Sequence, residues 1–287
     1  MGHAPHRPRS QRSSGRCTTR KRFRCAGQQA RRVSRQALTT ALILAGSRAG
    51  ASDPMAVAAG LPYKALLPIA GKPMIRHVID SLRATPGVGR IVVCIETPEA
   101  LNGILPPKVE TLAAAAGPSA SVLAAIQRYG TPLLVTTADN PLLQPAWTEA
   151  FLSGAGNADI AVGVATEAVV QRDIPDTTRT FIRLSDIAFS GCNLFLFRTP
   201  AAARVAVLWQ RLERERKKPL RMGWLLGPVI LLRFLMRRLD TKTLLARITS
   251  LTGAKARFVF MPDGRASVDV DKPADLELVR SMMDQSA

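Results

Sequence analysis

Residues 39–73 read TTALILAGSRAGASDPMAVAAGLPYKALLPIAGKP, and this stretch decides the fold class. It opens with an apolar run at 41–45, which predicts a short buried strand. Gly46 and Gly50 follow, and glycine lets a ligand approach the main chain closely because it has no side chain. A buried strand that ends in a glycine turn is typical of the first strand of an α/β domain.

The turn after this strand predicts a phosphate-binding loop. A strand that ends in small residues leaves backbone N–H groups free to face an anion. Arg48 lies between the two glycines and Lys64 follows farther along, so both can supply the positive charge that a triphosphate needs. The alternative is an ordinary strand–helix turn, which can also hold two glycines.

A second signal lies at residues 131–143, TPLLVTTADNPLL, where a continuous apolar strand ends abruptly at Asp139. Ligands of open parallel sheets bind beyond the carboxyl ends of the strands, and Mg²⁺ prefers carboxylate oxygen. We therefore expect Asp139 to bind the Mg²⁺ of a metal–triphosphate. An acid at this place can instead cap the following helix.

A third signal is the closing segment at 266–276, ASVDVDKPADL. Alternation along an extended chain places Asp269 and Asp271 on the same side. Asp275 then falls in the first turn of a helix predicted over 273–283, where a carboxylate interacts favourably with the helix dipole.

These motifs resemble those of the MobA-like nucleotidyltransferases. The resemblance rests on LAG at 44–46, KALLP at 64–68, GKP at 71–73, ADNPL at 138–142 and the closing segment. It covers residues 39–200 and 255–285. Ser47 stands where that family usually has a second glycine, and the stretch from Gly46 to Lys64 is longer than usual.

The resemblance implies a three-layer α/β/α sandwich with a mainly parallel, Rossmann-like sheet of the nucleotide-diphospho-sugar transferase type. It implies a Mg²⁺-dependent enzyme of EC 2.7.7 type that moves a nucleoside monophosphate from an NTP to a phosphorylated acceptor and releases pyrophosphate. An anionic acceptor phosphate needs no general base, which agrees with the lack of any histidine after His77.

The resemblance also assigns roles to single residues. The catalytic residues are Arg48, Lys64 and Asp139. The nucleotide-binding residues are Leu44, Ala45, Gly46, Ser47, Gly50, Lys64, Gly117, Ser119 and Ser121. The metal ligands are Asp139, Asp269 and Asp271, with Asp269 facing Asp139 across the cleft. Either serine can instead be a plain helix cap, and Asn193 can contact the acceptor or cap a turn.

The substrates stay open between alternatives. GTP and CTP both fit as donors, and a phosphorylated small molecule or a lipid-linked phosphate fits as acceptor. A nucleotide-sugar-dependent glycosyltransferase is a rival, as is a non-catalytic nucleotide-binding or membrane-associated protein. Release of pyrophosphate separates the nucleotidyltransferase from both. We expect no specific nucleic-acid partner, and the sequence does not indicate an oligomeric state.

The formal net charge of +19 is distributed unevenly. Residues 1–36 carry eleven basic residues, and no acidic residue precedes Asp53. Such a polar, basic segment cannot pack a core, so we expect 1–37 to be a disordered tail and 38–287 to be the catalytic domain. The tail is an arm for anionic surfaces or nucleic acid, or it is an irrelevant or mis-assigned extension, and we favour the second interpretation. A secretory signal is disfavoured because its cleavage would remove the first strand.

A second basic concentration surrounds the apolar run at 224–239, WLLGPVILLRFLMRRL, within a helical insertion predicted over 219–253. The run is shorter than the roughly 20 residues that span a bilayer. One interpretation is an interfacial helix on anionic lipid. The other is a helix packed on the core or on a partner subunit, which apolar residues on nearly all faces favour.

The remaining pattern predicts helices over 73–84, after 117–121, and over 145–153, and strands over 90–95, 109–112, 158–164 and 255–261. A strand pair is expected over 179–184 and 192–197. The four cysteines form no CxxC pair or metal-ligand spacing, which indicates a reducing compartment. We expect a cytoplasmic protein, or one held peripherally at the inner membrane if 219–253 binds lipid.

Overall fold

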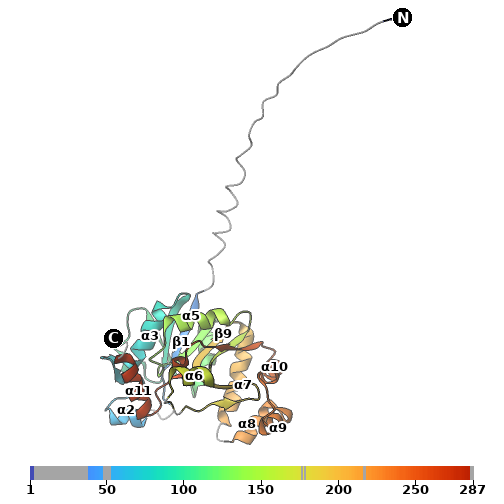
Figure 1. The fold of residues 1–287 in the computed structure, drawn as a ribbon. Coiled ribbons are helices and arrows are strands. Elements are labelled where there is room, and N and C mark those ends of the chain that lie inside the picture. The colour runs from blue at the N-terminus through green and yellow to red at the C-terminus, as the bar shows by residue number, and fades with distance from the viewer. Residues whose placement is uncertain (3–37, 48–52, 176, 178, 216–217, 285–287) are drawn as a thin grey trace. The chain divides into compact units, whose positions relative to one another are not determined.

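The computed structural model describes residues 1–2, 38–47, 53–175, 177, 179–215 and 218–284 (Figure 1). The predicted disordered tail falls outside the described residues apart from Met1 and Gly2. Arg48 and Gly50, which were predicted to belong to the phosphate loop, also lie outside them.

An eight-stranded, mostly parallel sheet forms the centre of the described chain (Figure 1). The strands lie in the order β10-β7-β9-β6-β1-β4-β5, and short β8 pairs with β9. Their bounds are β1 Thr39–Leu44, β4 Val88–Ile95, β5 Val109–Ala113, β6 Leu133–Thr137, β7 Ile160–Thr166, β8 Ile182–Arg183, β9 Ala188–Phe197 and β10 Ala256–Phe260. Strand β1 runs parallel to β4 and β6, whereas β9 runs antiparallel to β6 and β7.

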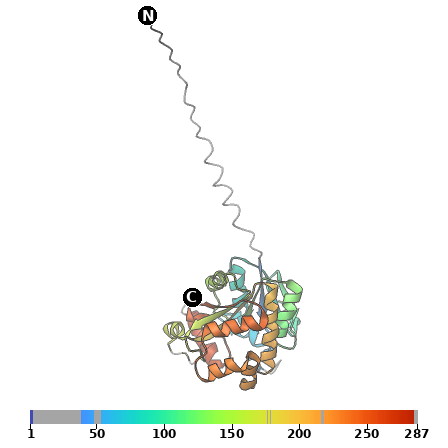
Figure 2. The ribbon, with the colours of Figure 1, turned by 90° about the vertical axis from the view of Figure 1, so that its right-hand side faces the viewer.

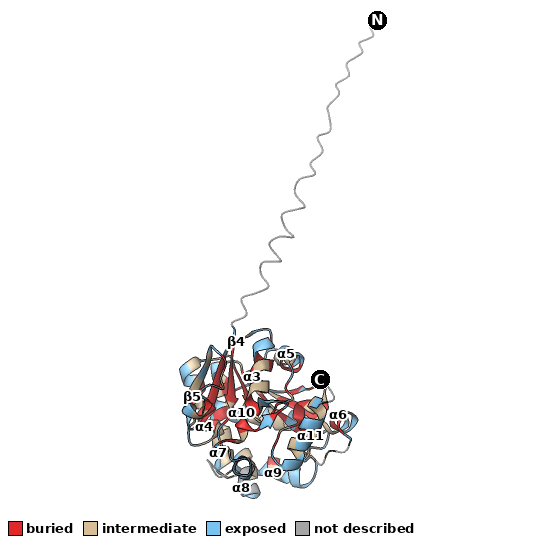
Figure 3. Cartoon of the chain, turned by 90° about the vertical axis from the view of Figure 1, so that its left-hand side faces the viewer, coloured by how far each residue is buried: buried red, intermediate tan, exposed pale blue. Residues whose placement is uncertain are grey.

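Helices cover both faces of the sheet (Figures 2 and 3), and a hydrophobic cluster fills the space on each face. Alternation along β1 sends Ala41 and Ile43 to one face, where α3 (Met74–Ala84) and α5 (Pro145–Gly154) pack. It sends Leu42 to the other face, where α4 (Pro118–Tyr129) and α7 (Ala203–Arg214) pack. The result is the predicted three-layer α/β/α sandwich.

A third, smaller cluster holds the closing segment. Buried Val268 and Val270 pack with Ile69, Met74 and Val279 of α11 (Pro273–Asp284). The 3₁₀ turn η5 (Gly264–Ser267) precedes this segment and contacts α6 (Glu167–Asp173). The alternation predicted for this segment is present, because the valines are buried while Asp269 and Asp271 line a pocket.

Two local predictions were wrong. Neither Ser119 nor Ser121 caps α4: the N-cap is Gly117, which has no side chain to accept a bond, and both serines lie inside the helix. Strand β8 is limited to Ile182–Arg183, shorter than the predicted 179–184, because only these two residues pair with β9.

The 219–253 region forms three helices, α8 (Pro219–Leu226), α9 (Pro228–Leu235) and α10 (Thr241–Thr252). Gly227 separates the first two and adopts a φ of 112°, a conformation that favours glycine. Across the described residues, every helix is too short or too polar to span a bilayer.

Gly264 is predicted to be intolerant of a side chain. A Cβ at this position lies 2.6 Å from Val170 Cα and 2.7 Å from Val169 O, and backbone atoms cannot easily move aside. We expect Gly264→Ala to lower the free energy of unfolding by about 1–3 kcal/mol, measured by urea denaturation. Gly191→Ala is the control, since no atom lies within 4 Å of its Cβ position. Equal stability of the two variants would contradict the prediction.

Candidate active site

A pocket of about 1030 Å³ opens at the carboxyl edge of the sheet. Parallel strands β1, β4 and β6 end together there, which is where ligands bind in open α/β sheets. The end of β1, the turn before α4, the end of β6, the last turns of α7 and the closing segment all contribute lining residues. Segments far apart in the sequence therefore meet at one cavity.

Lys64 joins two of the predicted metal ligands. Its Nζ lies 2.9 Å from Asp139 Oδ2 and 3.0 Å from Asp271 Oδ1. Burial by itself lowers the pKa of Lys64, but attraction to Asp139 and Asp271 outweighs burial and holds the pKa above its usual value. Lys64 is therefore a fixed positive charge at the pocket floor.

Asp269 is held by a second cation. Arg179 Nη2 pairs with its Oδ1, and Asn193 Nδ2 donates to its Oδ2 at 3.1 Å. Burial raises the pKa of Asp269, the bond from Arg179 opposes that rise, and the nearby charges of Asp139 and Asp271 add to it, so the pKa lies above its usual value. Three carboxylates thus share one site, and Lys64 and Arg179 offset their repulsion.

Asn193 lies within β9, so the predicted turn-capping role is wrong. Its φ of 50° is left-handed, a conformation that asparagine tolerates better than most residues. This backbone coincides with an irregular register between β7 and β9. Asn193 lines the pocket and positions Asp269 there.

The residues fit Mg²⁺ held by few protein ligands. In the described part of the chain, no three or more His, Cys, Asp or Glu side chains are grouped closely enough to hold a metal ion. Asp139 Oδ1, however, is buried and has no hydrogen-bond partner. Mg²⁺ commonly takes one or two carboxylates and completes its shell with water and phosphate oxygens. The three-ligand set of Asp139, Asp269 and Asp271 stays a prediction.

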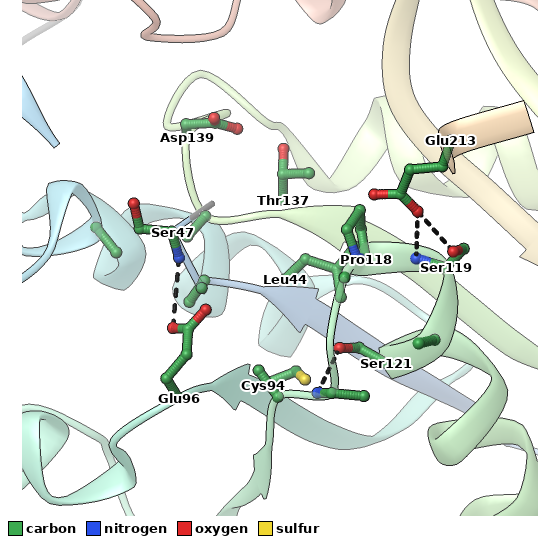
Figure 4. A pocket seen from close by; sticks show the side chains of 18 of the residues that line it. Leu44, Ser47, Cys94, Glu96, Pro118, Ser119, Ser121, Thr137, Asp139 and Glu213 are labelled. Atoms are coloured by element: carbon green, nitrogen blue, oxygen red, sulfur yellow. Dashed lines mark hydrogen bonds between the residues drawn. The ribbon is translucent and has the colours of Figure 1, made fainter. Parts of the chain in front are cut away.

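Glu96 lies beside Gly46 and Ser47, which are the described end of the predicted phosphate loop (Figure 4). Its Oε2 accepts from the Ser47 N–H at 3.3 Å, and its Oε1 lies 2.6 Å from where a Cβ on Gly46 would stand. Any side chain at Gly46 would therefore displace Glu96. Leu44 and Ala45 also line the pocket at this point. Sequence reasoning missed Glu96, although it follows β4 directly, as Asp139 follows β6.

The far end of the pocket is built around the start of α4 (Figure 4). Ser119 Oγ donates to Glu213 Oε2 at 2.6 Å, and Ser121 Oγ accepts from the Ala115 N–H at 3.0 Å. Glu213 comes from α7 and also lies beside Gly117. It was missed because α7 carries no motif.

Comparisons with known proteins identify the family and the fold. The pattern of the MobA-like NTP transferase domain matches residues 41–229. A hypothetical transferase from Thermus thermophilus is 30% identical, with a TM-score of 0.73 over 83% of this chain and 99% of that one. No curated protein sequence matches the chain.

Two more distant structures share the fold. CMP:2-keto-3-deoxy-manno-octonic acid synthetase complexed with CTP is 18% identical, with a TM-score of 0.55 over 87% of this chain and 100% of that one. A 4-diphosphocytidyl-2C-methyl-D-erythritol synthase from Anaerococcus prevotii is 8% identical, with a TM-score of 0.53 over 86% and 96%.

Arg179 is predicted to set the charge state of Asp269. In Arg179→Gln, burial and the neighbouring carboxylates remain, so the pKa of Asp269 rises further. A raised folded-state pKa gives stability that is present below about pH 4 and lost as pH rises through the folded value. We expect the variant to lose stability relative to the unmodified protein from pH 4 upward, measured by urea denaturation at several pH values. Arg183→Gln, which breaks an exposed pair with Glu167, is the control and should show no such trend.

Proposed function

The chain belongs to the MobA-like NTP transferase family and is a nucleotidyltransferase, and we propose that it transfers GMP or CMP from the triphosphate to a phosphorylated acceptor. The observation that carries the proposal is the position of Lys64, a partly buried cation that pairs with Asp139 and Asp271 at the carboxyl edge of the sheet. The pocket around it also has room for a nucleotide together with a second substrate.

We assign the triphosphate to the end of the pocket formed by Lys64, Gly46 and Ser47. Lys64 would bond phosphate oxygens, and backbone N–H groups of the loop would supply further donors. Arg48, outside the described residues, is our candidate for offsetting the charge that develops on pyrophosphate.

The proposed step is attack of an acceptor phosphate oxygen on the α-phosphorus. A new P–O bond forms, the bond between the α- and β-phosphates breaks, and pyrophosphate leaves with the bonding electron pair. The nucleophile is already an anion, so no proton has to be removed. The contribution of the protein is then alignment of the reactants and neutralisation of charge.

We propose that Asp139 and Asp269 hold Mg²⁺, with Asp271 in support. The bound ion would neutralise charge on the phosphates. Support comes from the unpartnered Oδ1 of Asp139 and from the excess of negative charge around Asp269. Arg214 and Lys218 also line the pocket, which supports an acceptor that carries a phosphate.

We propose that Glu213 contacts the nucleobase. Cytosine and guanine both carry an exocyclic amino group that a carboxylate can accept from, whereas uracil and hypoxanthine do not. Glu213 lies in the pocket at the opposite end from Asp139 and Ser47 (Figure 4), which supports this placement.

The first experiment is thermal melting with each of the four NTPs, with and without Mg²⁺, followed by pyrophosphate release with candidate phosphorylated acceptors. A ligand that binds only the folded state raises the melting temperature. A shift with GTP or CTP that needs Mg²⁺ supports the proposal. Binding of neither nucleotide would overturn it, and release of a nucleoside diphosphate from nucleotide-sugars would favour a glycosyltransferase.

Asp139→Asn is predicted to reduce Mg²⁺-dependent pyrophosphate release by about 100-fold or more, because the carboxylate that receives the metal is lost. The melting temperature without ligand should change little by comparison. Asp80→Asn is the control, since Asp80 of α3 pairs with Lys72 and does not line the pocket. Full activity of Asp139→Asn would exclude the metal assignment.

Glu213→Gln is predicted to relax base selection. Loss of a hydrogen bond to a charged group is expected to raise the KM for the preferred nucleotide by about tenfold or more. We expect the preference for CTP over UTP, or for GTP over ITP, to fall by a similar factor in competition assays. Glu149→Gln on the exposed side of α5 is the control and should behave like the unmodified protein. Unchanged preference in Glu213→Gln would disprove the base contact.

A further inference from the structure

Helices α8 and α9 expose an unusual amount of apolar surface. Leu220, Trp224, Val229, Leu232, Phe234 and Leu235 are each between 47% and 64% exposed, and we call them the α8–α9 apolar face. Among the described side chains of these two helices, Ile230 is the one that is buried. Contiguous exposed apolar patches of this kind mark interaction sites.

The two helices are held by contacts that leave this face uncovered. Gly223 of α8 packs directly against Leu231 of α9, so closely that a Cβ would stand 2.4 Å from Leu231 Cδ1. Arg247 of α10 donates to Leu226 O at 2.6 Å. The apolar run at 224–239 therefore buries Ile230 and Leu239, while most of its other apolar side chains stay exposed because the two short helices pair with each other.

The surroundings of the α8–α9 apolar face are strongly basic. Between residues 218 and 242 the chain has one acidic residue, Asp240. That carboxylate accepts from Thr243 N and Thr243 Oγ1 at the start of α10, so it is already used as a helix cap. The six basic residues of this stretch are Lys218, Arg221, Arg233, Arg237, Arg238 and Lys242.

We propose that the α8–α9 apolar face docks on an anionic lipid membrane. Apolar side chains enter the boundary between headgroups and acyl chains, Trp224 sits at the headgroups, and the basic residues bind acidic headgroups. Long arginine and lysine side chains can reach the headgroups while their stems stay among apolar groups. An anionic membrane thus matches both the exposed apolar side chains and the basic residues around them.

A second copy of the chain matches less well. A twofold contact through this face brings identical surfaces together, so the basic residues of the two copies would face each other. Like charges that approach in this way repel. Anionic lipid turns the same basic residues into attractive contacts.

The docked membrane would lie beside the catalytic pocket. Lys218 lines the pocket and is also the N-cap of α8, so the first residue of the membrane-facing helix pair borders the cavity. Figures 1 and 3 draw α8 and α9 next to α7, which supplies Glu213. Docking needs no nucleotide and stands independently of the proposed function.

The test is sedimentation of the full chain with phosphatidylcholine vesicles, with and without about one-third phosphatidylglycerol. We expect binding to the anionic vesicles to exceed binding to the neutral ones by about tenfold and to weaken as salt rises. Trp224 emission should shift to shorter wavelength on binding, because the indole leaves water.

Trp224→Ser combined with Leu235→Ser is expected to reduce vesicle binding about tenfold. The matched control is Ile182→Ser with Phe260→Ser, which removes apolar side chains of 51% and 54% exposure elsewhere. Arg237→Glu with Arg238→Glu should reduce binding to a similar degree, whereas Arg83→Glu with Lys108→Glu should not. Circular dichroism and melting confirm that each variant is folded.

Three results would overturn the proposal. They are no binding to anionic vesicles, equal binding to neutral vesicles, and unchanged binding by the Trp224/Leu235 variant. A dimer that these substitutions dissociate in the absence of lipid would identify a second copy as the occupant instead. Vesicle binding is measured without nucleotide. A lack of vesicle binding would therefore contradict the membrane proposal alone, whereas a lack of pyrophosphate release would contradict the proposed enzymatic function alone.

Discussion

The repulsion among three carboxylates is the constraint on which the candidate site depends. Asp139, Asp269 and Asp271 meet at the carboxyl edge of the sheet, where partial burial weakens the screening of their charges by water. Lys64 and Arg179 neutralise them and tie together four parts of the chain that are distant in sequence. The fold therefore brings the carboxylates together, and their ion pairs with Lys64 and Arg179 stabilise the fold at this edge of the sheet.

The sheet supplies the rigidity that such a cluster needs. Each face of β1 contributes to a separate hydrophobic cluster, so the strand that leads to Gly46 is packed from both sides. The third cluster holds Val268 and Val270 in place. Because side chains alternate along this segment, Asp269 and Asp271 then point into the pocket. The positions of the charged groups follow from apolar packing rather than from the charges alone.

The region from α8 to α9 differs from the rest of the fold in how its apolar side chains are packed. None of its described residues belongs to the three core clusters, and most of its described apolar side chains are exposed, with Ile230 as the buried exception. The helix pair is attached through α7 and α10 but adds little to the core. An exposed apolar surface lowers the solubility of a protein unless a partner covers it. Such surfaces therefore commonly serve as binding sites.

The sequence by itself determined the fold class, the order of most strands and helices, and the nearness of Lys64, Asp139, Asp269 and Asp271. Apolar periodicity and turn residues encode strands and helices locally, and chain direction places strand ends at one edge. Only the tertiary structure decided that β9 inserts antiparallel between β6 and β7, that Arg179 pairs with Asp269, and that Glu96 and Glu213 line the pocket. Those partners lie far apart along the chain, and long-range packing brings them together without leaving a local pattern. The tertiary structure also decided that the α8–α9 apolar face is exposed. The same apolar residues could pack against the core or face solvent, and their neighbours in the folded chain determine which of the two occurs.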